Sequence, residues 1–338
     1  MRAYEVQETD PDYEGVVQVE RDRPTPGAGE ALVRIRAASL NYRDLAIADS
    51  ELIYPGTDLP VVPLSDGAGE VVAVGDGVSD LSEGDRVATP FAPDWIDGPS
   101  APEKVARSTG GNVDGALAEY AVFPAESLTT LPEHLSYEQG ATLSCAGLTA
   151  WRALAEDGDL GAGESVLALG TGGVSTFALQ FAKLHGAEVV VTSSSDEKLD
   201  RARDLGADET INYEATPEWG PVVAEELGGV DHVVEVGGPN TLEQSLQAAA
   251  HGGHVHLIGV LAGQAGQVDP SPILAKALDV EGVIGVGSQA MFERMTEAMR
   301  VAELEPVVDR VFDFDEAREA YRYVEAGNHQ GKVVISVD

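Results

Sequence analysis

A glycine-rich turn between an apolar run and an amphipathic run is the segment best suited to chemistry. Residues 165–187 read SVLALGTGGVSTFALQFAKLHGA, which predicts a buried strand, a tight turn at Gly170–Ser175 and a helix. Gly170 permits the turn, Gly172 lets the backbone approach a pyrophosphate, and Ser175 stands where a third glycine is usual. The unpaired amides that begin the helix favour an anion. A purely structural turn is the alternative, but the strand–turn–helix context favours dinucleotide binding. The predicted cofactor contacts here are Gly170, Thr171, Gly172, Gly173 and Val174.

The end of the next predicted strand bears on the choice between NAD and NADP. NAD sites usually carry an acidic side chain there, which accepts from the ribose 2′-hydroxyl. The segment VVVTSSSDEK (189–198) instead has Ser193 and Ser194, which leave room for a 2′-phosphate, and Lys198 can pair with that phosphate. Alternatively, Ser194 and Glu197 form a helix capping box with Lys198 on the surface. A cap does not exclude phosphate contact, and Lys198 is one of only five lysines. We therefore predict NADP(H) as the cofactor.

The charge of the chain limits its partners. The 338 residues include 58 acidic and 21 basic ones, for a formal net charge of -37. Such a field repels nucleic acid and anionic membranes, so we expect neither as a partner. The acidic residues are spread along the chain, which indicates a halophilic, salt-adapted surface. Cys145 is alone, so no internal disulfide can form. A signal pattern and a long apolar run are both missing. We expect a cytoplasmic protein that acts on a small molecule.

The spacing of apolar residues changes along the chain. The first third predicts strands at 31–40, 67–75, 82–90 and 115–124, and a long loop at 92–112. Strands and helices then alternate. Strands are predicted at 166–169, 188–192, 209–212, 230–235, 254–258, 279–287 and 331–337. Helices are predicted at 136–156, 174–185, 196–205, 217–228, 239–250, 289–301 and 316–327. This order predicts an α/β fold with a Rossmann doubly wound parallel sheet.

These motifs together resemble the medium-chain dehydrogenase/reductase superfamily, in particular its zinc-free, quinone-oxidoreductase-like branch. The resemblance runs from PGAGEALVRIRAASLNYRD through DGALAEYAV, AGLTAW, GTGGVS and VEVGG to GKVVISV, in the family's order. It implies a GroES-like β-rich catalytic domain of residues 1–135 and 307–338, and a Rossmann NADP-binding domain of residues 136–306. It also implies a homodimer paired across the apolar edge strand VEGVIGV (280–286).

The sequence departs from the zinc-dependent members of this superfamily where their metal ligands lie. Asn41 stands where they carry a cysteine ligand, and Leu64-Ser65-Asp66 stands where they carry Gly-His-Glu. The loop 92–112 has no cysteines. A tetrahedral zinc site needs thiolate or imidazole ligands at fixed spacing, so we predict no metal. The histidines at 251, 254 and 256 fall at the fifth Rossmann strand, where the family holds none, and Cys145 is interpreted as a core residue rather than a nucleophile.

The resemblance also implies positions for further cofactor contacts. Thr149 of AGLTAW would lie near the nicotinamide, Tyr213 beside Lys198 at the adenosine phosphate, and Asn328 would close over the phosphates. Four residues at the ends of the fourth and fifth strands would line the dinucleotide, and two after them would border the nicotinamide. They are Val236, Gly237, Ile258 and Gly259, followed by Val286 and Ser288.

The remaining polar residues suit reduction of an activated carbonyl better than oxidation of a simple alcohol. Alcohol oxidation needs removal of a proton, by zinc or by a tyrosine with lysine four residues later, and none of the nine tyrosines has that lysine. Hydride addition to a quinone or an α,β-unsaturated carbonyl needs only hydrogen-bond donors for the oxyanion. By the resemblance, we expect Tyr54 or Tyr42 as the donor and Asn41 as its orienter, although both tyrosines could simply pack. Arg43 and Asp44 are interpreted as a structural pair.

Two other functions remain open on the sequence. One is an NADP-dependent alcohol or aldehyde dehydrogenase, and the other is a non-catalytic NADPH-binding protein. The leading hypothesis is a zinc-independent, NADPH-dependent reductase of quinones or activated alkenes.

Overall fold

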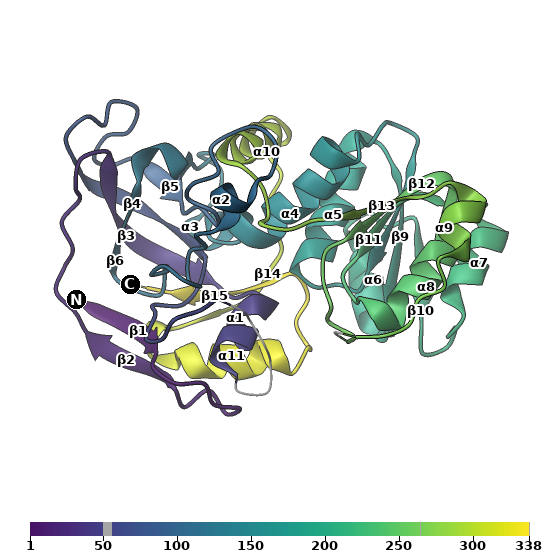
Figure 1. Ribbon diagram of the computed structural model, residues 1–338, viewed down its shortest axis with the longest axis horizontal. Helices are drawn as coiled ribbons and strands as arrows, with labels where there is room; N and C mark the ends of the chain where they lie inside the picture. Colours follow the sequence, from purple (N-terminus) through teal and green to yellow (C-terminus); the bar gives the residue numbers. More distant parts are fainter. Residues whose placement is uncertain (50–55, 264, 338) are drawn as a thin grey trace. The chain divides into compact units, whose positions relative to one another are not determined.

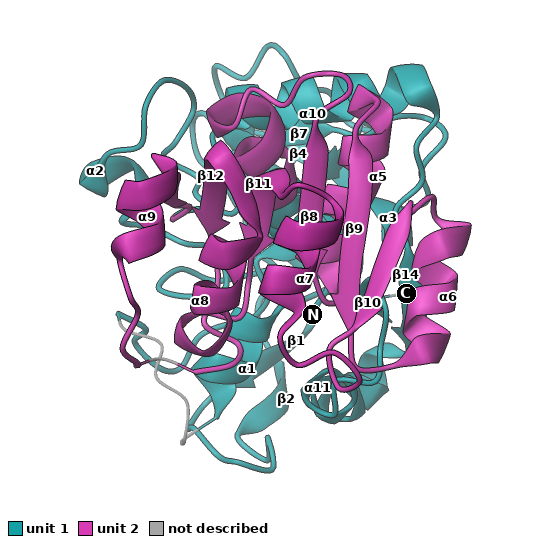
Figure 2. Cartoon of the chain, turned by 90° about the vertical axis from the view of Figure 1, so that its right-hand side faces the viewer, with its two compact units in different colours: residues 1–148, 285–338 teal, residues 149–284 magenta. Residues whose placement is uncertain are grey.

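The protein divides into two compact units. The computed structural model describes residues 1–49, 56–263 and 265–337. The first unit contains Met1–Leu148 and Gly285–Asp338, and the second contains Thr149–Ile284 (Figure 2). Within the described residues, no helix is long and apolar enough to cross a membrane.

The second unit is built on a six-stranded parallel sheet (Figures 1 and 2). Its strands in spatial order are β10 (Glu209–Asn212), β9 (Glu188–Ser193), β8 (Ser165–Leu169), β11 (Val230–Glu235), β12 (Ala249–Leu257) and β13 (Asp279–Gly282). From β8 the chain proceeds outward on one side to β9 and then β10. From β11 it proceeds outward on the other side to β12 and then β13. The direction of winding therefore reverses between β8 and β11, which is where open parallel sheets bind ligands at the carboxyl ends of their strands.

Five helices connect these strands, and they end where the sequence provides stop signals. They are α5 (Gly173–His185), α6 (Asp196–Asp204), α7 (Trp219–Glu226), α8 (Pro239–Ala248) and α9 (Ser271–Lys276). Gly186 ends α5 in the left-handed region, with φ 79°, which glycine adopts without a steric cost. The core of this unit is formed by branched side chains such as Val190 of β9, Val233 of β11 and Val255 of β12, all buried. Branched residues on both faces are typical of a covered parallel sheet.

The first unit is a mainly antiparallel β structure completed by both ends of the chain. Its seven-stranded sheet consists of β14 (Val308–Phe312), β15 (Lys332–Ser336), β3 (Glu30–Ser39), β4 (Asp66–Val74), β5 (Arg86–Ala88) and β7 (Thr129–Thr130), with β6 (Tyr120–Pro124) also paired to β3. β1 (Arg2–Val6) and β2 (Val16–Glu20) form a separate pair. The pairing of β15 with β3 brings Val334 opposite Ser39, so residues almost 300 positions apart become neighbours.

The helices of the first unit are α1 (Tyr42–Ala48), α2 (Pro102–Val105), α3 (Tyr137–Gly140), α10 (Gln289–Ala302) and α11 (Ala317–Glu325). α4 (Leu148–Trp151) contains the boundary between the two units. The predicted helix 136–156 is interrupted by π-helical turns at Leu143–Gly147 and Arg152–Asp157. Ser136 caps its first turn, because the Ser136 hydroxyl accepts from the Gln139 amide in a capping box.

The α/β architecture and the parallel sheet agree with the sequence prediction, whereas several short elements do not. β13 ends at Gly282 although a strand was expected to 287, and the loop 92–112 contains α2. β1, β2 and β14 were not predicted, since edge strands of five residues carry little periodicity. The predicted domain limits at 135 and 306 differ from those of the compact units. Helix α10 contributes to the first unit, where Gln289 Nε2 donates to Leu128 O and Thr129 Oγ1 donates to Gln289 Oε1.

Candidate functional site

The glycine turn of the second unit leaves space where a pyrophosphate is expected. Gly170 has φ 75°, which favours glycine, and a Cβ added at Gly170 or Gly172 would meet no atom within 4 Å. The Gly172 backbone itself is extended, with φ -73° and ψ -174°. Open space beside a glycine at this position of a βαβ unit is what a close approach of phosphate requires. Gly170, Thr171 and Gly172 therefore connect β8 to α5, and Gly173 and Val174 begin α5, so the turn lies where the sequence predicts it.

The start of α5 supplies hydrogen-bond donors to the same space. The residue that caps the helix is Gly172, so no side chain there accepts from the first amides. Ser175, which stands for the third glycine, is buried, and its hydroxyl donates to Leu169 O at 2.5 Å. The hydroxyl thus turns back onto the end of β8 and does not occupy the phosphate space. A serine at this position is compatible with dinucleotide binding.

The ends of β9 and β10 form a polar corner beside the start of α6. Tyr213 N donates to Ser193 O at 3.1 Å, and the Tyr213 side chain is partly exposed. Ser194 is exposed, and Lys198 lies in the first turn of α6. Tyr213 is therefore a neighbour of Ser193, and Ser194 and Lys198 lie between the end of β9 and the first turn of α6. Their contact with a 2′-phosphate stays a prediction.

The capping interpretation of this segment needs one correction. The cap of α6 is Ser195, whose hydroxyl accepts from Lys198 N at 3.4 Å, and not Ser194. Ser195 is extended, with φ -120° and ψ 121°, as a capping residue must be. The nearby carboxylates bind other groups, since Asp196 accepts from Asn212 Nδ2 and Glu197 pairs with Arg201. Ser194 is left as a surface hydroxyl at the predicted phosphate position.

A buried carboxylate that the sequence analysis missed organises the turn after β11. Glu235 is fully buried, and its carboxylate accepts from Gly237 N at 2.6 Å, Gly238 N at 2.9 Å and Thr241 Oγ1 at 2.6 Å. The backbone oxygen of Glu235 accepts from Ile258 N. These bonds bring the turn at Val236–Gly237 against the turn at Ile258–Gly259, where a Cβ on Gly259 would lie 2.6 Å from Val236 O. The four predicted residues are thus one surface at the carboxyl ends of β11 and β12.

The remaining predicted cofactor residues lie in different surroundings. Thr149 is a buried residue of α4, at the beginning of the second unit. Val286, with φ 68°, Ser288 and the exposed Asn328 belong to the first unit. The Ser288 hydroxyl caps α10 by accepting from Met291 N at 3.2 Å. Their contacts with a cofactor stay predictions.

A buried ammonium occupies the part of the first unit where zinc-dependent relatives of the sequence would carry ligands. Lys332 at the start of β15 is 3% exposed, and its Nζ donates to Leu40 O at 2.5 Å and Asn41 Oδ1 at 2.6 Å. It also pairs with Asp66 Oδ2 at 3.4 Å. The Asp66 carboxylate, fully buried, accepts from the hydroxyls of Ser65 and Ser39. We refer to Ser39, Asn41, Ser65, Asp66 and Lys332 as the Lys332 cluster.

The helix next to the Lys332 cluster carries the other predicted catalytic residues. Asn41 precedes α1 and its backbone N donates to Asp44 Oδ2 at 2.7 Å. Tyr42, the first residue of α1, is 39% exposed. Tyr54 lies outside the described residues. Burial raises the pKa of the Asp44 carboxyl to about 6, although Arg43 acts in the opposite direction.

The residues of the Lys332 cluster do not fit a zinc ion. An amide and two hydroxyls are poor zinc ligands, and the single carboxylate of Asp66 already binds an ammonium and two hydroxyls. In the described ranges, no group of three or more His, Cys, Asp or Glu side chains is arranged to hold a metal. Burial, with Asp66 nearby, raises the pKa of the partly buried Cys145 thiol, which disfavours the thiolate that a nucleophile needs.

The histidines that the sequence analysis grouped are arranged differently from the prediction. His254 and His256 stack with His232 of β11, and His251 is exposed and takes no part. The His232 and His254 ring centroids are 5.0 Å apart. Burial and the neighbouring imidazoles lower the pKa of His256 to about 3, so this ring is neutral at physiological pH. The stack is an aromatic contact between β11 and β12.

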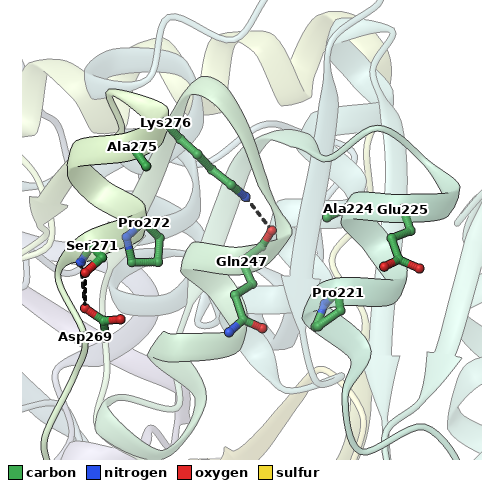
Figure 3. A pocket seen from close by; sticks show the side chains of 9 residues that line it. All are labelled: Pro221, Ala224, Glu225, Gln247, Asp269, Ser271, Pro272, Ala275 and Lys276. Atoms are coloured by element: carbon green, nitrogen blue, oxygen red, sulfur yellow. Dashed lines mark hydrogen bonds between the residues drawn. The ribbon is translucent and has the colours of Figure 1, made fainter.

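A hollow in the second unit lies away from the glycine turn. It is bounded by α7, the end of α8 and α9 (Figure 3). In it, Lys276 Nζ donates to Gln247 O at 2.6 Å and also to Ala249 O. The ammonium thereby caps the last carbonyls of α8. The hollow has no convergent set of side chains that could perform a reaction.

Comparison with known proteins agrees with both halves of the fold. An alcohol dehydrogenase GroES-like domain matches residues 27–133, and a zinc-binding dehydrogenase domain matches residues 173–302. A zinc-type alcohol dehydrogenase-like protein of Schizosaccharomyces pombe is 44% identical over 92% of this chain and 91% of its own length.

Solved structures extend the similarity over the whole chain. A putative alcohol dehydrogenase of Sinorhizobium meliloti superposes with a TM-score of 0.91 and 41% identity, covering 99% of this chain and 98% of that one. An NAD-dependent alcohol dehydrogenase superposes with a TM-score of 0.90 and 32% identity, with both chains covered completely. A mycobacterial protein in complex with NADPH superposes with a TM-score of 0.82 and 27% identity, covering 99% of each chain.

Proposed function

The chain belongs to the medium-chain dehydrogenase/reductase family, and we propose that it is a zinc-independent, NADPH-dependent reductase of quinones or α,β-unsaturated carbonyls. The observation that carries the proposal is the buried Lys332 ammonium, bound to Asn41 and Asp66. By the sequence resemblance, Asn41 and Asp66 correspond to ligand positions of the zinc-dependent members, and we infer that the ammonium supplies the positive charge that their metal supplies. Conjugated carbonyls suit such a site because they need no metal to remove a proton.

The preference for NADPH is supported by the corner at the end of β9. Ser193, whose hydroxyl accepts from Ser195 N, ends β9, Ser194 is exposed after it, and Lys198 lies in the first turn of α6. The carboxylates close by are bound to Asn212 and Arg201, so they are not directed to a ribose 2′-hydroxyl. A 2′-phosphate would gain a charge-assisted hydrogen bond from Lys198. The nicotinamide ring, when bound, supplies the hydride.

The protein's own contribution is binding, orientation and stabilisation of negative charge. The turn at Gly170–Val174 and the start of α5 hold the pyrophosphate, and Val236, Gly237, Ile258 and Gly259 line the dinucleotide. The segment that begins α1 offers Asn41 and Tyr42 to the substrate oxygen, with Tyr54 as the further donor predicted from the sequence. Thr149, Val286, Ser288 and Asn328 complete the predicted cofactor contacts.

An alcohol dehydrogenase is the second candidate. The observation that favours it is that three of the similar proteins described above are named alcohol dehydrogenases or alcohol dehydrogenase-like. That reaction requires a base for the hydroxyl proton. Asp44 is the carboxyl of this region whose pKa lies nearest neutrality, but its burial and its bond to Asn41 N leave it little access to a substrate.

Assays with purified protein separate these functions. In concentrated salt, which screens the charge of -37, the proposal expects NADPH oxidation with quinones or enones and full activity after chelator treatment. Loss of turnover with chelator, together with stoichiometric zinc and oxidation of simple alcohols, would establish the alternative. Tight NADPH binding with no turnover on either panel would indicate a non-catalytic binding protein.

We also propose a homodimer paired through β13. This strand ends the order of the described strands in the six-stranded sheet, and the Ile284 side chain that follows it is 70% exposed. An exposed edge with apolar residues is stabilised by pairing with a second copy. Sedimentation or light scattering in concentrated salt tests this, and a monomer would exclude it.

A further inference from the structure

One donor in the Lys332 cluster, the side-chain NH₂ of Asn41, has no partner among the described residues. Asn41 Nδ2 is buried and makes no hydrogen bond with the described part of the chain. The same side chain accepts from Lys332 Nζ through Oδ1 at 2.6 Å. A buried N–H without a partner is destabilising, so native proteins rarely keep one without a reason.

Lys332 determines which way the Asn41 amide points. An ammonium group can only donate, so it must face the amide oxygen, and the NH₂ group must then face the opposite way. A flipped amide would bring two donors together beside a buried charge. The ammonium is itself fixed, because it also donates to Leu40 O and pairs with Asp66. Asp66 in turn is held by two serine hydroxyls.

The strand pairing explains why this arrangement is rigid. Leu40 N donates to Val333 O at 3.0 Å, next to the pairing of Ser39 with Val334. Lys332 and Asn41 thus lie at adjacent positions of β15 and the end of β3. Asp66 is paired with Ser39 at the start of β4. Three strands therefore hold the amide, the ammonium and the carboxylate.

We propose that Asn41 Nδ2 is the hydrogen-bond donor to the substrate oxygen, and that Lys332 is a positioning residue which fixes the Asn41 amide in that orientation. This inference rests on the proposed function and changes the expected part of Asn41 from an orienter of tyrosine to the donor itself. A hydrogen bond to Oδ1 from a cation also polarises the amide and strengthens its N–H as a donor.

The charge balance of the reaction fits this arrangement. A hydride adds to the electrophilic carbon of an enone, the carbon–carbon π bond breaks, and its electron pair moves through the conjugated system to the carbonyl oxygen. The resulting enolate oxygen accepts from Asn41 Nδ2, and the enolate then takes a proton from solvent. Lys332 keeps its proton throughout. Donors fixed before the reaction stabilise such an oxyanion without reorganisation.

The decisive variant is Asn41→Asp. It keeps an oxygen for Lys332 and nearly the same size, but it removes the donor. Loss of one oxyanion donor lowers kcat by about 100-fold or more, so we expect that loss with an unchanged Kd for NADPH. Lys332→Met should lower kcat similarly. Lys332→Gln should recover part of the rate, because its amide can still donate to Asn41 Oδ1, whereas a purely structural lysine would not show this order.

Lys276→Met is the matched control, since it removes the same charge from another lysine held by backbone carbonyls. We expect its kcat to equal that of the wild type. The thermal unfolding midpoint of each variant verifies folding. An Asn41→Asp variant that is folded and keeps kcat within about threefold would overturn the inference, since the expected loss of a donor is far larger.

A second measurement separates this inference from the proposed reaction. 4-Nitrophenol changes colour on ionisation, and a site with a fixed donor should bind its phenolate in the protein loaded with NADP⁺. We expect this binding in the wild type and its loss in Asn41→Asp. Phenolate binding that depends on Asn41, without turnover of any enone or quinone, would reject the reaction and keep the donor. Turnover that is insensitive to Asn41→Asp would keep the reaction and reject the donor.

Discussion

The glycine turn of the second unit and the Lys332 cluster of the first differ in whether their polar groups have partners inside the protein. At the turn, Gly170 and Gly172 leave open space, and the first amides of α5 have no side-chain cap. In the cluster, Lys332 and Asp66 are buried together, and almost every polar atom has a partner within the chain. Asn41 Nδ2 is the exception among the residues that the structure describes.

This difference indicates that the two regions would bind a negative charge in different ways. The turn offers donors and space, so its positive potential is completed only by an anion from outside. The Lys332 cluster contains its own anion, the Asp66 carboxylate. The Lys332 ammonium therefore acts on a substrate only through the side-chain N–H of Asn41, whose orientation it fixes. A protein with a net charge of -37 needs such local arrangements, because its overall field opposes both a polyanionic cofactor and an oxyanion.

The largest effect is expected when the buried pair is broken. Asp66→Ala leaves the Lys332 ammonium buried without its carboxylate, and breaking such a pair costs about 3–5 kcal/mol of unfolding free energy. Urea unfolding at constant salt measures this. Asp66→Asn, which keeps an oxygen acceptor for Lys332, should lose less unfolding free energy than Asp66→Ala. A cost below about 1 kcal/mol for Asp66→Ala, which is the range of exposed ion pairs, would show that the cluster is not a buried charge pair.

A pH effect of similar size is expected at Asp44. Its pKa is raised to about 6 in the folded protein, against about 3.9 in an unfolded chain. A raised folded pKa gives stability that is complete below pH 4 and is lost as the pH rises through 6. The wild type should therefore lose about 2–3 kcal/mol relative to Asp44→Asn between pH 4 and 7. Equal pH profiles for the two proteins would contradict the assigned burial.

At the turn, filling the open space should remove the cofactor without unfolding the protein. Gly172→Val places methyl groups where no protein atom lies within 4 Å of the Cβ, so the thermal midpoint should hardly change. NADPH binding, measured by fluorescence, should weaken about 100-fold or more, since close backbone approach is required there. Gly282→Val is the control, because its added Cβ also meets open space. Normal NADPH affinity in Gly172→Val would place the pyrophosphate elsewhere.

The smallest effect is expected for the choice of cofactor. Lys198→Ala should weaken NADPH by about 10-fold or more and leave NADH nearly unchanged, because a charge-assisted hydrogen bond contributes about 1.5–3 kcal/mol. Lys183→Ala removes the same charge from an ion pair with Asp208 in the same unit and serves as the control. Equal losses for NADPH and NADH in Lys198→Ala would reject the assignment to NADP.

The sequence predicted the parallel sheet well because its signals are local. β8, β9, β10 and β11 begin and end within one residue of the predicted positions. Buried branched runs bounded by glycine, aspartate or serine carry this information within about ten residues. The capping residue of α6 shows the limit of such signals, since three consecutive serines offer equal chemistry. Only the extended backbone at Ser195 decides which of them caps the helix.

Family, fold class and the position of the dinucleotide turn were thus determined by the sequence itself, because each depends on a motif that is continuous in the chain. The Lys332 cluster could not be found in this way. Lys332 and Asn41 are separated by 291 positions, and neither residue is unusual in its own segment. Their contact exists only because β15 pairs with β3. The tertiary structure alone decided that this lysine is buried beside Asp66 and holds the amide of Asn41, because burial and hydrogen bonding between distant strands are fixed by packing and not by local spacing.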